Sequence, residues 1–176
     1  GQVMFKNQWV KLSSRQETIQ VKGGPPVTLT IRSTPHGPLV SDLLPEEKQA
    51  LAYRWTYVAA EEANELDGFF ALDRAGNWDQ FRAALSRFGA VAQNVVYADR
   101  EGHIGMQTAG VFPRLTGRAD GTRFRKGWDG SEEWDGFHAF QENPASFDPP
   151  QGWLASANNS TVPAPPPFYI SSQWEP

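Results

Sequence analysis

Short runs in which apolar and polar residues alternate fill residues 1–41, and this pattern predicts a β meander. The runs at 3–5 and 9–12 flank a Lys-Asn-Gln turn, and those at 18–21 and 27–31 flank a Lys-Gly-Gly-Pro-Pro turn. β-Branched or aromatic residues alternate with polar ones in each run, as expected for strands with one buried and one solvated face. A His-Gly-Pro turn and one more short strand complete the meander.

Two helices are predicted after this meander. The segment 62–73 places its apolar residues largely on one side, and Gly76 follows as a C-terminal stop. Asn77 suits the N-cap of the second helix, and Gln80 follows it in a capping-box position. The apolar stripe of this helix ends before Gly89. The apolar residues are Leu66, Phe69, Phe70 and Leu72 in the first helix, and Trp78, Phe81, Leu85 and Phe88 in the second.

The other segments differ in character. An apolar run at 51–58 leaves a buried strand and a helix end both open. Apolar alternation on both sides of a charged glycine turn predicts a β-hairpin over 88–105. Two Trp-Asp-Gly triplets, at 128–130 and 134–136, are interpreted as paired turns pinned by tryptophan. The proline-rich stretch 163–167 predicts an extended segment that runs over a surface.

Together these elements place the chain in the α+β class, as a single piece with three regions. Residues 1–58 are mainly β meander, 59–89 form the helical pair, and 90–176 hold the hairpin and long loops. The chain opens in a strand-like pattern and stops after an aromatic run, whereas natural termini are more often polar. We therefore expect an internal fragment of a larger domain.

The composition of the chain argues against several classes of function. The 176 residues amount to about one domain, long enough to bury a core, and the 16 glycines and 14 prolines indicate many turns. The net charge of −4 gives no reason to expect nucleic acid or an anionic membrane as partner. The absence of cysteine excludes disulfides and thiolate metal sites. No stretch approaches the ~20 apolar residues of a membrane span.

Eight motifs occur in the order and spacing of one enzyme family. They lie at 6–12 and 14–19, and continue with His-Gly-Pro at 36–38, Arg-Trp at 54–55, Asn-Trp-Asp-Gln-Phe at 77–81, Gln-Asn-Val-Val-Tyr-Ala-Asp at 93–99, Gly-Trp-Asp-Gly at 127–130 and Ala-Asn-Asn at 157–159. In this combination the chain resembles part of the β subunit of the penicillin acylase (penicillin amidase) family of N-terminal nucleophile hydrolases. The resemblance implies an αββα fold, of which this chain would form an internal segment.

The resemblance also implies a chemistry. Members of that family hydrolyse linear amide C–N bonds with an N-terminal serine exposed by autoproteolysis, whose α-amino group, with a pKa of about 7.7–8, serves as base. A backbone N–H and the side-chain amide of the first asparagine in Ala-Asn-Asn, here Asn158, hold the oxyanion. Taken without the family, an Asn-Asn-Ser run is most often only a turn. Gly1 has no nucleophilic side chain, so we expect the chain alone to be inactive.

The substrate and partners follow from the same resemblance. It implies a β-lactam, an acyl-homoserine lactone or a related N-acyl substrate, with Phe69 and Gln93 at acyl-pocket positions. Phe69 also suits a plain core position, and Gln93 departs from the aliphatic residue of penicillin G-type enzymes. The α subunit and the remaining β-subunit segments of the same precursor are the implied protein partners, in the periplasm or outside the cell.

A structural calcium ion is also implied by the resemblance, with most of its ligands outside this chain. The loop around Asp120 and Gly121 lies where one backbone carbonyl ligand is expected, and hard oxygen donors suit this ion. The local match is poor, so no metal ligand is assigned. The basic loop 114–126 around them offers charge for an anion, but Asp120 and the glycines favour a plain exposed loop.

The histidines and the tryptophans bear on two other functions. The three histidines do not have metal-ligand spacing, and no nucleophile elbow supports a triad of Ser41, His36 and Asp42. The rival function is a non-catalytic module that binds carbohydrate or a protein partner through exposed tryptophans. Its test is whether three of them form an exposed platform. These are Trp128, Trp134 and Trp153.

Overall fold

The computed structural model describes residues 1–59, 64–89, 91–117, 123–160, 168 and 170–171. The chain divides into two compact units. The N-terminal unit comprises Gly1–Trp55 and the return segment Arg125–Glu133, and the central unit comprises Thr56–Phe124 and Trp134–Pro176. The pattern of the sequence did not indicate this division, because the return segment joins strands that are distant from it along the chain.

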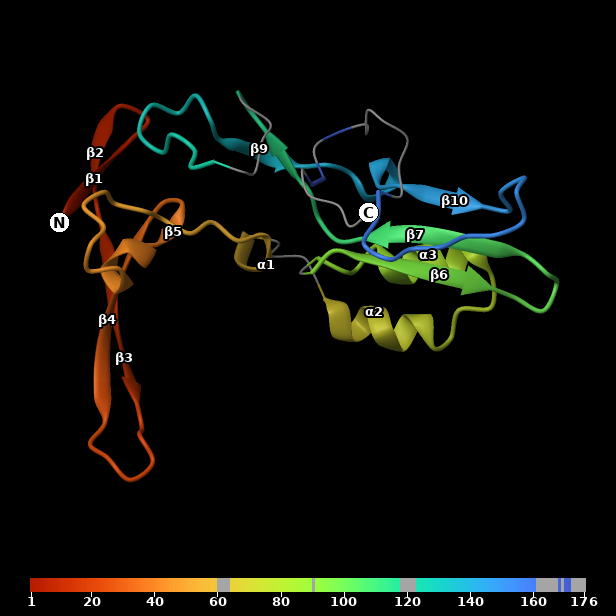
Figure 1. Cartoon of the computed structure of the whole chain (residues 1–176), viewed down its shortest axis with the longest axis horizontal. Coiled ribbons are helices and arrows are strands. Elements are labelled where there is room, and N and C mark those ends of the chain that lie inside the picture. Colours follow the sequence, from red (N-terminus) through yellow and green to blue (C-terminus); the bar gives the residue numbers. More distant parts are fainter. Residues whose placement is uncertain (60–63, 90, 118–122, 161–167, 169, 172–176) are drawn as a thin grey trace. The chain divides into compact units, whose positions relative to one another are not determined.

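The N-terminal unit is the predicted β meander. Its strands pair as antiparallel neighbours in the orders β1-β2 and β3-β4-β5, labelled in Figure 1. The strands are β1 (Gln2–Phe5), β2 (Gln8–Lys11), β3 (Ser13–Ile19), β4 (Val27–Thr34) and β5 (Gly37–Pro38). β3 and β4 are longer than the predicted runs because their register continues without a break to Ser13 and Ser33. The short strand predicted after the His-Gly-Pro turn is wrong, because β5 lies within that motif and a short 3-10 helix, Val40–Leu43, follows it.

The ribbon formed by β3 and β4 has one apolar face. Directly paired residues share a face, so Ile19 and Val27 lie on the same side as Glu17 and Leu29, while a pair of threonines lies between them on the other side. Every residue of β3 is exposed, and Ile19 keeps 50% of its surface accessible. The alternation of residues is therefore that of a half-buried sheet, but this chain does not bury the ribbon.

The helices belong to the central unit and are capped largely as predicted. They are α1 (Thr56–Ala59), α2 (Glu65–Leu72) and α3 (Trp78–Leu85). The Asn77 side chain accepts a hydrogen bond from the Gln80 amide at 2.9 Å, which confirms the N-cap of α3. The predicted start of the first helix at residue 62 is wrong, because Asn64 is a non-helical N-cap whose side chain accepts from the Asp67 amide. None of the helices in the described part has the length and apolar character that a bilayer crossing requires.

The open run 51–58 contains pieces of both predicted structures. Ala52 forms an isolated antiparallel bridge with Leu39, within the N-terminal unit. α1 begins four residues later, at Thr56, and belongs to the central unit. The boundary between the two units therefore falls inside one apolar run, and periodicity alone does not locate it.

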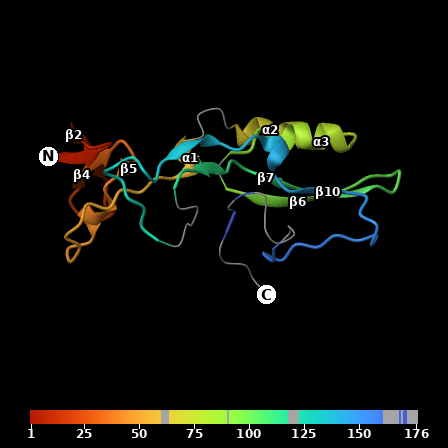
Figure 2. The ribbon, with the colours of Figure 1, turned by 90° about the horizontal axis from the view of Figure 1, so that it is seen from above.

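The predicted central hairpin is confirmed, although it spans 93–109 and not 88–105, and it forms most of a sheet in the order β10-β7-β6. Its strands are β6 (Gln93–Ala98), β7 (Ile104–Ala109) and β10 (Ala145–Phe147). Figure 2 shows α2 and α3 on one face of this sheet. The core lies between α3 and the sheet, where Phe81, Leu85, Phe88 and Ala109 are buried against Val95 and Tyr97.

A second ribbon pairs β8 (Pro113–Leu115) with β9 (Trp134–Phe137), and a 3-10 helix, Phe140–Glu142, precedes β10. The second Trp-Asp-Gly triplet therefore starts a strand, and its interpretation as a turn paired with the first is wrong. Strand pairing of Trp134 with Leu115 outweighed the turn preference of Asp and Gly. The proline-rich stretch 163–167 lies outside the described residues.

Candidate functional site

Asn158, the predicted oxyanion residue, lies in a turn of the segment that follows β10. Its φ of 61° is in the left-handed region, which asparagine tolerates better than most residues. The Ala157 amide donates to Asn159 Oδ1 at 2.9 Å, which closes the turn around Asn158. The Asn158 side chain is exposed, and no hydrogen bond joins it to another described residue. The two N–H donors of its carboxamide therefore remain available to a ligand.

A chain of polar side chains connects this turn to the sheet. Asn94 in β6 donates from Nδ2 to Ser156 Oγ at 3.1 Å, and its Oδ1 accepts from Thr108 Oγ1 at 2.7 Å. Asn94 and Thr108 are directly paired across β6 and β7. They lie on the face opposite Val95 and its neighbours, which pack on the helices. Figure 2 agrees, since the segment after β10, drawn in blue, runs on the side of the sheet away from α2 and α3.

Buried side-chain amides bind Thr108, the residue of this polar series that lies deepest in the sheet. Thr108 is only 6% exposed, and its amide donates to the Pro144 carbonyl at 2.8 Å. Its carbonyl accepts from Gln107 Nε2 at 2.9 Å and from Asn143 Nδ2 at 3.3 Å. Gln107 Oε1 in turn accepts from the Arg82 guanidinium at 2.8 Å. Because buried polar groups are costly to leave unpaired, these hydrogen bonds fix the position of the Thr108 backbone.

Sequence reasoning did not identify Asn94 or Ser156, which are 62 residues apart. The one signal available was the position of Asn94 within the predicted strand. A polar residue between Gln93 and Val95 alternates onto the face away from the helices. The sequence contains no comparable signal for Ser156, because the segment that carries it has no period.

The two predicted acyl-pocket residues lie on the helix side of the sheet. The Phe69 ring on α2 meets the Phe88 ring edge to face at 4.9 Å, yet Phe69 keeps 57% of its surface exposed. Gln93 is exposed at the first position of β6, on the same face as Val95. Asn158 follows a segment on the opposite face. The pocket roles of Phe69 and Gln93 and the catalytic role of Asn158 stay predictions.

A shallow groove of about 670 Å³ lies between α2 and α3. Alanines form much of its wall, and Asp67, Arg74 and Arg87 contribute its charged side chains. None of the three predicted site residues lines it. The groove therefore offers no support for an acyl pocket made of Phe69 and Gln93.

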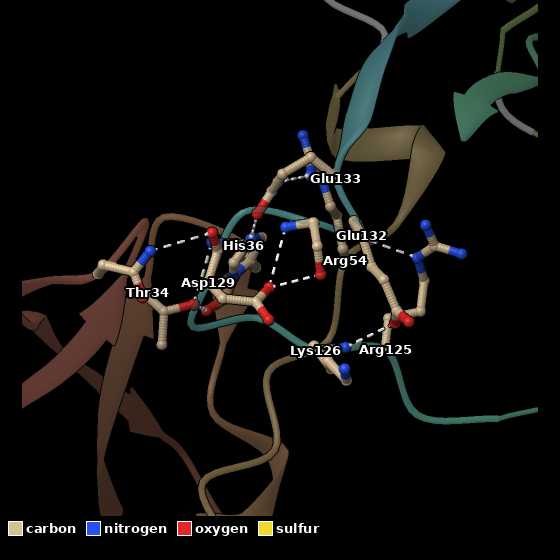
Figure 3. A network of polar contacts seen from close by, with 11 residues as sticks. Thr34, His36, Arg54, Arg125, Lys126, Asp129, Glu132 and Glu133 are labelled. Atoms are coloured by element: carbon tan, nitrogen blue, oxygen red, sulfur yellow. Dashed lines mark hydrogen bonds and ion pairs between the residues drawn. The ribbon is translucent and has the colours of Figure 1, made fainter. Parts of the chain in front are cut away.

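A polar network in the N-terminal unit ties the return segment to the meander (Figure 3). Glu133 is 14% exposed and accepts from Arg54 at 3.1 Å, while its other oxygen lies 2.8 Å from His36 Nε2. On the same segment the Lys126 amide donates to Glu132 Oε2 at 2.8 Å. The His36 amide donates to Thr34 Oγ1, which fixes the His-Gly-Pro turn. These contacts fix the return segment against the meander.

Each of the three histidines faces a carboxylate, and the three pairs share no residue. The pairs are His36 with Glu133, His103 with Asp148, and His138 with Glu142. The triad of Ser41, His36 and Asp42 is not formed. The Asp42 carboxylate binds the Arg32 guanidinium through two hydrogen bonds, and Ser41 Oγ accepts from the Leu51 amide.

The described residues hold no group of three or more His, Cys, Asp or Glu side chains that suits a metal ion. The loop around Asp120 and Gly121, where one calcium ligand was expected, lies outside the described residues. Among the described residues, therefore, none is assigned to calcium.

The tryptophans of the rival binding function differ in exposure. Trp128 is 52% exposed and Trp153 is 64% exposed. Trp134 is only partly exposed, and its ring packs on Phe137 at 6.0 Å between centroids. The three residues therefore do not share the exposure that the binding hypothesis needs.

Comparison with known proteins identifies relatives of this chain. The family described as penicillin amidase matches residues 1–176. The chain is 38% identical to acyl-homoserine lactone acylase QuiP of Pseudomonas aeruginosa, over 95% of this chain and 20% of that protein. It is 30% identical to penicillin G acylase of Escherichia coli, over 91% of this chain and 18% of that protein. The chain thus spans about a fifth of the length of the curated relatives it matches.

A solved structure shows the same fold. The thermostable penicillin G acylase from Alcaligenes faecalis superposes with a TM-score of 0.80 at 29% identity. The superposition covers 97% of this chain and 31% of that one. The α+β class predicted from the sequence is confirmed by this match.

Proposed function

We infer, because this chain belongs to the penicillin amidase family, that it forms part of an acylase that hydrolyses a linear amide bond and releases an acyl group. The observation that carries this proposal is the match of the family along residues 1–176. Relatives named acyl-homoserine lactone acylase and penicillin G acylase support an acyl-homoserine lactone, a β-lactam or a related N-acyl compound as substrate. We assign the activity to a larger protein that contains this chain.

The proposal places the nucleophile outside this chain. The chain spans about a fifth of the length of its curated relatives, and we assign the attacking group to another segment of the larger protein. By family resemblance this group is an N-terminal serine whose α-amino group takes up the hydroxyl proton. A remaining β-subunit segment of the same precursor would supply it, and the α subunit is the other proposed protein partner. A periplasmic or secreted location and a structural calcium ion belong to the proposal on the same ground.

Asn158 is proposed to donate one side-chain N–H to the carbonyl oxygen as that oxygen becomes negatively charged. The closed turn fixes its backbone, and no described residue competes for its donors. A preorganised donor of this kind contributes ~10²–10³ in rate when water is excluded around it. Because Asn158 is exposed in this chain, the proposal requires segments from outside the chain to cover the site.

Removing the carboxamide tests the proposal. We expect Asn158→Ala to abolish turnover by the protein that contains this chain, with folding and autoprocessing largely intact. Asn158→Gly is the sharper variant, because glycine adopts a φ of 61° without strain and the loss can then be assigned to the donor. Its kcat for acyl-homoserine lactone or penicillin G, followed through the released amine, should fall by about 10²–10³.

The control for this experiment is Gln16→Ala, which removes an exposed carboxamide from β3 and should leave kcat unchanged. Near-normal kcat in Asn158→Gly would refute the oxyanion role. Binding of the same compounds by the unaltered protein without any turnover would refute hydrolysis and favour the rival binding function.

A further inference from the structure

We propose that Asn94 and Ser156 are positioning residues that hold the turn carrying Asn158 in register with the sheet. This inference rests on the proposed oxyanion role of Asn158. The bond from Asn94 Nδ2 to Ser156 Oγ is 3.1 Å long, and Ser156 precedes Asn158 by two residues. The internal bond from the Ala157 amide to Asn159 fixes the shape of the turn. The hydrogen bond from Asn94 anchors this turn to the sheet.

The direction of the Asn94 amide follows from its second partner. Its oxygen accepts from Thr108 Oγ1 at 2.7 Å, so its nitrogen points away from Thr108 and toward the turn. Asn94 is itself half-buried in a paired strand, and Thr108 is buried and bonded through both its amide and its carbonyl. The anchor is therefore rigid, since each group that directs Asn94 is held by another.

The turn itself needs such an attachment. Residues 155–158 are exposed and belong to no strand or helix. A side chain on a segment of this kind samples many orientations unless a bond to a rigid element removes them. Catalysis depends on this, because a displacement of about 1 Å at a reacting group can reduce the rate by about 10². Asn94 and Ser156 touch no substrate in this proposal and act only through Asn158.

Ser156→Ala is the test, because Ser156 is exposed and its loss leaves no buried group unpaired in the core. In the protein that contains this chain, kcat for the substrate hydrolysed should fall about tenfold while KM stays within about twofold, as expected when one hydrogen bond stops holding a donor in place. Ser156→Thr restores the hydroxyl and should restore kcat. Ser14→Ala, an exposed serine of β3, is the matched control with unchanged kcat.

A double variant separates this inference from the proposed function. In an Asn158→Gly background, Ser156→Ala should cause no further loss of kcat, because the donor that Ser156 positions is gone. Hydrogen–deuterium exchange of the peptide covering 153–160 should also rise in Ser156→Ala, and this readout needs no activity. A normal kcat in Ser156→Ala, or a loss that persists beside Asn158→Gly, would overturn the positioning role alone. A normal kcat in Asn158→Gly would overturn the oxyanion role as well.

Discussion

Gly105→Ala inserts one methyl group where the core of the central unit has no room for it. An added Cβ at Gly105 lies 2.5 Å from the Trp78 ring, far inside ordinary van der Waals contact. The backbone of Gly105 does not have a positive φ, so the cost of alanine here is steric. Trp78 cannot yield easily, since it stacks on Phe81 and on Phe147, with ring centroids 5.4 and 5.1 Å away.

The magnitude follows from the cost of overpacking. Forcing one carbon into a well-packed core destabilises a protein by about 1–3 kcal/mol. Replacing glycine by alanine also restricts the unfolded chain, and this stabilises the folded protein by about 0.4–1 kcal/mol, which offsets part of the steric cost. We therefore expect a net loss of about 1–2 kcal/mol in the free energy of unfolding. For a chain of this size the melting temperature should fall by about 2–4 °C per kcal/mol.

Urea unfolding followed by tryptophan fluorescence measures this loss. Gly76→Ala is the control, because its added Cβ makes only an ordinary contact at 3.5 Å with the end of the Gln80 side chain. In a Trp78→Ala background the ring is absent, so Gly105→Ala should cost nothing further. The steric reasoning is wrong if Gly105→Ala costs no more than Gly76→Ala, or if its cost persists without Trp78.

Two further predictions concern charged groups. The Asp148 carboxylate hydrogen-bonds His103 and raises the pKa of that imidazole above 6.5. While Asp148 is ionised, their pair therefore adds stability that is complete below pH 6.5 and is lost as the pH rises through the raised pKa of His103. NMR titration should show the His103 pKa returning toward 6.5 in Asp148→Asn, and an unchanged pKa would contradict this cause. Glu133→Gln should destabilise the protein by about 1–2 kcal/mol in urea unfolding, because His36 and Arg54 lose their shared carboxylate; unaltered stability would show that the network is not needed.

Local signals account for the parts of the fold that sequence reasoning predicted well. The cap formed by Asn77 and Gln80 and the stripe that includes Phe81 and Leu85 are set within one helix, and both are present. The hairpin of β6 and β7 is likewise encoded by alternation around one turn. In each case the interacting residues are close along the chain, so a short pattern contains the information.

The missed features depend on contacts between distant residues. His36 and Glu133 are 97 residues apart, and neither lies in a pattern that predicts the other. The second Trp-Asp-Gly triplet forms a strand because Trp134 pairs with Leu115 of β8. The functional motif shows the same limit. The resemblance pointed to Asn158, but the residues that attach its turn to the sheet follow only from the three-dimensional arrangement.

The β3–β4 ribbon has a consequence for handling the chain in isolation. β3 is an edge strand with unpaired backbone groups, and the ribbon presents Ile19, Val27 and Leu29 to water. Such an edge is a template for another strand, so concentrated solutions of the isolated chain should self-associate there. The ion pair of Arg15 and Glu17 interrupts this apolar surface, and charges on an edge strand oppose such pairing.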